Sequence, residues 1–132
     1  MQTGIFNRKD IMKEIKRINR ESELESLIKN SENELIVVFK NSTRCPISFG
    51  ALREFELWAA ELNHPNIQLY RIDVIEQRNL SNYLVELTGV QHQSPQIIFI
   101  INGNVVDHYS HSTIRKERLN ESISEIGVKN EI

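Results

Sequence analysis

The sequence predicts an α/β fold in which a central mixed β-sheet is flanked by helices. Short apolar runs typical of buried strands alternate with stretches of helical periodicity, and an Asn-Gly turn at 102–103 joins the last two strands into a hairpin. The predicted order is β-α-β-α-β-α-β-β-α. We expect a single domain over residues 1–132, with loosely ordered ends at 1–12 and 128–132.

The first predicted elements are an edge strand, a helix and a central strand. Residues 14–18 could form a short edge strand. Ser22 and Glu25 form a capping-box pair, which predicts a helix that begins there and ends near Asn30. The apolar run 35–39 is too short for a buried helix and predicts a strand covered on both faces.

The second helix is predicted after residue 45. Its apolar residues recur at helical spacing as far as Leu62, and Pro46 suits the first turn because an N–H group there has no helical partner. Trp58 lies on the apolar face of this helix and is expected in the core. The remaining predicted elements are a strand over 67–74, a helix over 80–87 closed by Gly89, strands over 97–101 and 105–109, and a helix over 113–126.

Composition excludes several classes of function. Sixteen basic and eighteen acidic residues are interspersed along the chain, which disfavours nucleic acid as the main ligand. No apolar run approaches the ~20 residues of a membrane span, and residues 1–20 lack the apolar core of a signal peptide. A single unpaired cysteine fits a reducing compartment, so we expect a cytoplasmic protein with no membrane partner.

The only cysteine, Cys45, lies between the central strand and the second helix. The N-terminus of a helix is the backbone position best able to hold a thiolate. The third residue after it is Ser48, so an internal disulfide cannot form and any redox chemistry here uses one thiol. The alternative interpretation is a small buried residue with no chemistry, as many isolated cysteines are.

The residues around the cysteine favour a reactive thiol. Pro46 directs the chain into helical geometry, and Arg44 adds a positive charge. Ser48 either satisfies backbone donors in the first turn or donates a weak hydrogen bond to sulfur. Thr43 and Ser42 are either simple loop residues or donors to the thiolate.

The element order, the position of the cysteine motif and a proline just before the hairpin resemble the thioredoxin fold over nearly the whole chain. More narrowly, the chain resembles the YtxJ family of monothiol bacilliredoxin-like proteins in the bacillithiol system. The matching motifs are Ser42-Thr43-Arg44-Cys45-Pro46-Ile47-Ser48, Arg53-Glu54-Phe55, Asp73-Val74-Ile75-Glu76, Gly89-Val90, His92, Ser94-Pro95-Gln96 and Ser110-His111.

The resemblance implies a monothiol thiol-disulfide oxidoreductase that removes bacillithiol, or a similar small thiol, from mixed disulfides on cytoplasmic proteins, and it implies a set of site residues. Cys45 would be the nucleophile, and the partners would be bacillithiolated proteins together with bacillithiol, a low-molecular-weight thiol co-substrate. The Ser94–Pro95 bond would be cis and would face the thiol. His92 lies three residues before Pro95 and is expected to neighbour the thiol. No bound cofactor is expected.

Other functions remain as alternatives. A non-catalytic adaptor of the same fold would capture thiolated proteins without turnover. A one-cysteine peroxidase is disfavoured because position 38 is valine where such sites usually carry a proline, and a shared iron-sulfur cluster is disfavoured by Pro46. A metal site is disfavoured because a full hairpin separates His92 from His108 and His111, and no close pair of histidines has ligand spacing on a predicted helix.

Overall fold

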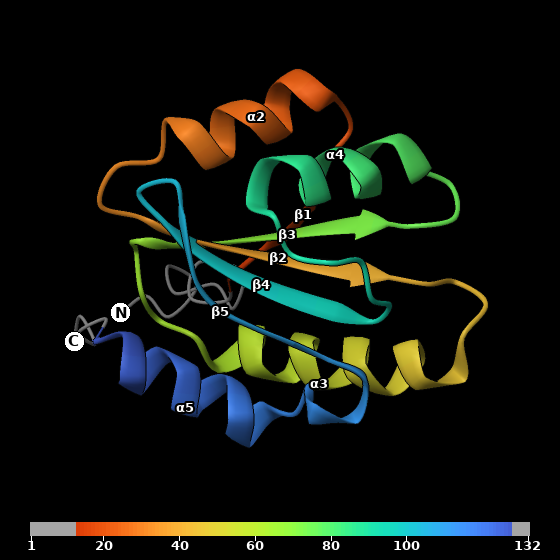
Figure 1. Cartoon of the computed structure of the whole chain (residues 1–132). Coiled ribbons are helices and arrows are strands. Elements are labelled where there is room, and N and C mark those ends of the chain that lie inside the picture. The colour runs from red at the N-terminus through yellow and green to blue at the C-terminus, as the bar shows by residue number, and fades with distance from the viewer. Residues whose placement is uncertain (1–12, 128–132) are drawn as a thin grey trace, which may run out of the picture.

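The computed structural model describes residues 13–127, so the ends at 1–12 and 128–132 lie outside the described residues. The predicted order of strands and helices is confirmed (Figure 1). The elements are β1 (Ile15–Arg17), α2 (Glu21–Lys29), β2 (Leu35–Asn41), α3 (Pro46–Glu61), β3 (Ile67–Asp73), α4 (Arg78–Thr88), β4 (Gln96–Ile101), β5 (Asn104–Ser110), the 3₁₀ helix η2 (His111–Thr113) and α5 (Lys116–Ile126). None of the helices within 13–127 combines the length and the apolarity needed to span a bilayer.

The described strands form one mixed sheet in the order β1-β3-β2-β4-β5. The central strand β2 runs parallel to β3 and antiparallel to β4. β1 and β5 form the two edges of the sheet, and the edge position of β1 was predicted. Helices α2 and α4 cover one face of the sheet, and α3 and α5 cover the other (Figure 1).

Alternate side chains of β2 divide the core into two layers. Val37 and Phe39 lie in the layer of α3 and α5, whereas Ile36 and Val38 lie in the layer of α2 and α4. Trp58 of α3 is buried, as predicted, and its indole N–H donates to Asn120 Oδ1 at 3.1 Å. Each large apolar side chain buried in this way stabilises the fold by about 1.5–3 kcal/mol. The two layers therefore hold the end of β2 and the start of α3 in place.

The hairpin turn and the end of α4 depend on left-handed backbone conformations. Asn102 and Gly103 have φ angles of 50° and 81°, the combination that a tight two-residue hairpin turn requires. Gly89 has a φ angle of 74° and ends α4. Both sequence predictions are confirmed.

The predicted capping box at Ser22 is wrong. Helix α2 begins at Glu21 after the extended residue Arg20, so Ser22 lies inside the first turn, where its hydroxyl is not in the capping position. The carboxylate that reaches back is that of Glu23, which accepts the N–H of Asn19 at 3.0 Å. The side chain of Glu25 instead pairs with other groups on α2 and α4.

The predicted start of the last helix at Thr113 is also wrong. Residues 111–113 form a separate 3₁₀ turn, and α5 begins at Lys116. Between them Ile114 has an extended backbone, with a φ angle of −76° and a ψ angle of 96°, and its side chain is only 2% exposed. Burial of the Ile114 side chain in the core accounts for the break between η2 and α5.

Candidate functional site

Cys45 is the N-cap residue of α3 and follows the C-terminal end of the central strand β2. Its backbone is extended, and its carbonyl accepts the N–H of Ser48 at 3.0 Å and that of Phe49 at 3.3 Å. Pro46 is the first helical residue, as predicted. The thiol is free and partly buried. The positive end of the helix dipole of α3 therefore lies next to the thiol.

Ser48 connects the first turn of α3 to the preceding loop. Its side chain is fully buried, and Ser48 Oγ accepts the N–H of Ser42 at 3.1 Å. Of the two interpretations of Ser48, the structure shows the one in which it satisfies a backbone donor. The bond holds the β2–α3 loop against the helix start and so restricts where Cys45 can lie.

Thr43 and Arg44 lie on the exposed side of this loop. The Thr43 hydroxyl donates to Glu76 Oε2 at 3.0 Å, which places it as a loop residue. The Arg44 side chain is exposed and forms none of the ion pairs found within residues 13–127. Neither residue lines the cavity beside the thiol.

A cavity of about 340 Å³ opens beside Cys45, near the lower end of the size range of small-molecule sites. The predicted site residues Cys45, His92 and Ser94 meet there, although they come from different loops. The Ser94–Pro95 peptide bond is cis, as expected. Ser94 Oγ is buried and has no hydrogen-bond partner, so a polar atom at the cavity remains available to a ligand.

The family of the chain follows from a comparison with family models. The model described as "Monothiol bacilliredoxin BrxC" matches residues 16–119, a span that contains every predicted site residue. The chain belongs to the monothiol bacilliredoxin family. This confirms the family expected from the motifs around Cys45 and assigns the chain to thiol redox chemistry.

Solved structures place this bacilliredoxin among thioredoxin folds. A candidate oxidoreductase with a thioredoxin fold is 26% identical, with a TM-score of 0.72 over 89% of this chain and 97% of the other. Thioredoxin from Fasciola hepatica is 23% identical, with a TM-score of 0.66 over 84% and 98% of the two chains. Spinach chloroplast thioredoxin f, short form, is 16% identical, with a TM-score of 0.66 over 87% and 95%. The last two show the fold alone.

Several residues at the cavity of this bacilliredoxin were not predicted as site residues, among them Arg78, Ser81 and Lys40. Arg78 and Ser81, from the first turns of α4, line it. Lys40 lies behind the wall with 0% exposure, and Lys40 Nζ donates to the carbonyl of Ser81 at a long 3.5 Å. Burial lowers the pKa of Lys40 to about 8. A signal was present, because the period of two along β2 places Lys40 on the same buried face as Val38.

His92 lines the cavity beside Ser81, the residue that Lys40 also contacts. Its ring atom Nδ1 lies 3.3 Å from Ser81 Oγ. Burial lowers the pKa of His92, and the positive charges of Lys40 and Arg78 lower it further. The imidazole is therefore mainly neutral at pH 7, and both cations act on the same part of the cavity wall.

His108 and His111, the other two histidines weighed as metal ligands, lie elsewhere in this bacilliredoxin. His108 is on β5, and His111 is in η2, where its Nδ1 lies 3.0 Å from Ser110 Oγ. Within the described part of the chain, no group of three or more His, Cys, Asp and Glu side chains is placed to hold a metal ion.

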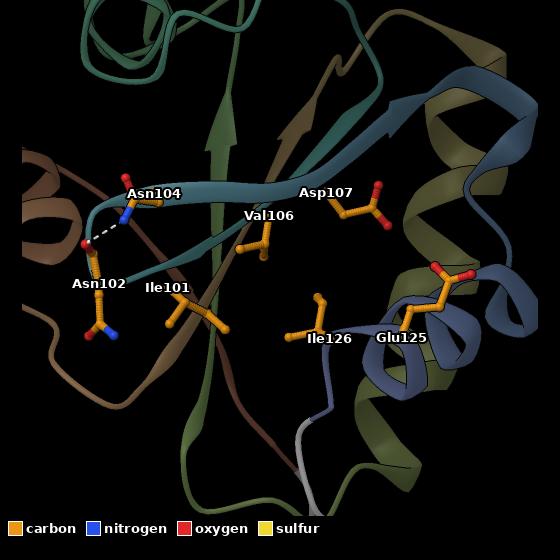
Figure 2. Close-up of a pocket in the computed structure, with 7 residues that line it drawn as sticks. All are labelled: Ile101, Asn102, Asn104, Val106, Asp107, Glu125 and Ile126. Carbon is orange, nitrogen blue, oxygen red and sulfur yellow. Dashed lines mark hydrogen bonds between the residues drawn. The ribbon is translucent and has the colours of Figure 1, made fainter.

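A second cavity, of about 570 Å³, lies away from the thiol. It is formed by the β4–β5 hairpin and the last turn of α5, with Val106, Asp107, Glu125 and Ile126 among its lining residues (Figure 2). It contains no cysteine and no histidine, and none of the predicted site residues reaches it. The cavity beside Cys45 is therefore the candidate site.

Proposed function

We propose that this bacilliredoxin removes bacillithiol, or a similar small thiol, from mixed disulfides on cytoplasmic proteins, with Cys45 as the nucleophile. The observation that carries the proposal is a lone thiol at the N-terminus of α3 that opens on a cavity large enough for a small thiol. A serine stands at position 48, three residues later, and no second cysteine exists in the chain. The small thiol therefore has a place to remain after transfer.

The first step is an exchange at sulfur. The Cys45 thiolate attacks the sulfur of the small thiol in the mixed disulfide. The old S–S bond breaks, the substrate protein leaves as a thiolate that takes a proton from water, and a new S–S bond joins the small thiol to Cys45. No net oxidation occurs, because one disulfide replaces another.

The second step needs an external thiol. A second molecule of the small thiol attacks the adduct on Cys45, so the pair leaves as its own disulfide and the Cys45 thiolate is restored. Thioredoxin-like proteins with two cysteines can instead close an internal disulfide. Such a cycle fits the reducing thiol pool of the cytoplasm.

The residues around Cys45 would position the reaction. The first turn of α3 stabilises the thiolate before attack and when Cys45 leaves in the second step. The Pro95 carbonyl accepts the N–H of His111 at 3.0 Å, whereas no described backbone hydrogen bond uses Ser94, so the backbone of Ser94 before the cis bond would pair with a bound peptide or thiol. Neutral His92 offers a ring nitrogen at the cavity wall.

A turnover assay tests the proposal against the adaptor alternative. A protein carrying one mixed disulfide with bacillithiol, glutathione or coenzyme A is incubated with the bacilliredoxin and an excess of the same free thiol. We expect catalytic release with bacillithiol fastest and with Cys45→Ser inactive but folded by circular dichroism. Binding without release by the native protein would favour the adaptor. Release by Cys45→Ser would require a mechanism without the cysteine.

A further inference from the structure

We propose that the cavity beside Cys45 has a cationic end, formed by Arg78 at its surface and Lys40 behind its wall, which binds the carboxylate of the small thiol that Cys45 exchanges. This inference rests on the proposed function, since it identifies the chemical class of the small thiol. The site would favour thiols that carry a carboxylate over neutral thiols of the same size.

The charges that face the cavity are all positive. Among its lining residues Arg78 is the one permanently charged group, and no lining residue carries a carboxylate. Arg78 lies in the first turn of α4, which contains no acidic residue to neutralise the positive end of the helix. No ion pair within residues 13–127 uses Arg78.

Lys40 adds a buried cation to the same wall. Its side chain has 0% exposure, and its one described hydrogen bond is the 3.5 Å contact with the carbonyl of Ser81, itself a lining residue. A buried ammonium group normally has a carboxylate partner, because loss of its hydration is costly. No such partner exists for Lys40 among residues 13–127.

The acidic residues on either side of the lining segment 74–75 do not themselves line the cavity. Asp73 pairs with Arg17 and Arg71, at 2.7 and 3.2 Å. Glu76 accepts the hydroxyl of Thr43. An anionic ligand in the cavity would therefore be the natural partner for the unpaired charges.

The polar atoms at the wall suit carboxylate oxygens. Ser94 Oγ is buried without a partner and can donate a hydrogen bond. Arg78 and His92 line the same cavity, and Ser81 contacts both Lys40 and His92, so an anion bound there would lie near all three groups. The sulfur end of the ligand would then face Cys45 and the carboxylate would face α4.

Two matched disulfides test the inference. The protein is mixed with dithiodipropionate, which is anionic, or with the hydroxypropyl disulfide of the same chain length, which is neutral. In each case Cys45 attacks one sulfur, half of the disulfide leaves as a thiolate and the other half stays on Cys45. Intact-protein mass measures the rate. The ratio of the anionic rate to the neutral rate is compared between variants, which cancels the intrinsic reactivity of each reagent.

We expect Arg78→Gln and Lys40→Met each to lower this ratio on the order of threefold to tenfold, as loss of a charge-assisted contact does. Added salt should lower the ratio of the native protein as well. The control is Arg53→Gln, which removes the same charge from an exposed position on α3 that does not line the cavity, and it should keep the native ratio. Since Lys40 is buried, Arg78→Gln decides the result if Lys40→Met does not fold.

The outcomes separate the inference from the function on which it rests. If adducts form with both reagents and the ratio is the same in Arg78→Gln as in the native protein, the cationic end is refuted while the monothiol function stands. If neither reagent forms an adduct on Cys45, the proposed function fails and the inference fails with it. A fall of the ratio in Arg53→Gln equal to that in Arg78→Gln would also refute the site, because the effect would come from net charge.

Discussion

Replacing Ser48 by alanine removes the hydroxyl that links α3 to the loop before Cys45. The Ser42 N–H that donates to Ser48 Oγ at 3.1 Å would then be buried without a partner. An unsatisfied buried donor costs about 1–3 kcal/mol. The higher helix propensity of alanine offsets about 0.5 kcal/mol of this. The free energy of unfolding should fall by about 0.5–2.5 kcal/mol.

Urea unfolding followed by the fluorescence of the single, buried Trp58 measures this loss. The dependence on urea should keep the native slope, since the amount of surface exposed on unfolding does not change. The matched control is Ser22→Ala, an exposed serine in the first turn of α2 without a described hydrogen bond, which should change stability by less than about 0.5 kcal/mol. Equal losses in the two variants, or no loss in Ser48→Ala, would refute the role given to Ser48.

Three further predictions concern the position of Cys45, the ion pairs of Asp73 and two glycines. Ser48→Cys should form an internal disulfide with Cys45 on mild oxidation and release a bound small thiol without a second equivalent; two alkylatable thiols after oxidation would contradict the placement of Cys45 at the helix start. Burial raises the pKa of Asp73, but hydrogen bonds and neighbouring arginine charges outweigh it and hold that pKa below its usual value. The ionised Asp73 carboxylate therefore contributes its full stabilisation above about pH 4, and this contribution is lost as the pH falls further. In acid titrations Asp73→Asn should lower the free energy of unfolding at pH 7 and should reduce how steeply that free energy falls below pH 4. An unchanged dependence on pH would argue against the ion pairs. In thermal unfolding, Gly50→Ala should stabilise the protein by about 0.5–1 kcal/mol, because Gly50 lies within α3 and an added Cβ meets no other atom. Gly89→Ala should destabilise it by about 1 kcal/mol, because Gly89 has a φ angle of 74°. A less stable Gly50→Ala with a more stable Gly89→Ala would contradict the helical position of Gly50 and the left-handed conformation of Gly89.

Periodicity predicted the central elements because their pattern is local. The apolar run of β2 and the helical spacing of α3 are both set by residues within one segment, and Pro46 marks the start of the helix. Helix starts were less predictable. Capping depends on the backbone conformation of one residue, and Arg20 takes the N-cap position of α2 although Ser22 has the better capping side chain.

The candidate site was only partly predictable, because some of its residues are brought together by elements far apart in the sequence. Motifs in the sequence identified Cys45, His92 and Ser94, which meet at one cavity. Lys40 was missed because a lysine at the end of a strand is usually exposed. Its burial depends on α4, which begins almost forty residues later and covers that face of the sheet.

The central claim is that Cys45 takes the small thiol and releases the substrate protein. The most direct measurement is a single-turnover reaction in which excess native protein is mixed with a protein carrying one bacillithiol mixed disulfide, quenched with acid and read by intact mass. The account predicts bacillithiol on Cys45 and a substrate protein with a free thiol, at equal rates of appearance. A covalent complex of the two proteins as the product, or a substrate that keeps its bacillithiol, would contradict it.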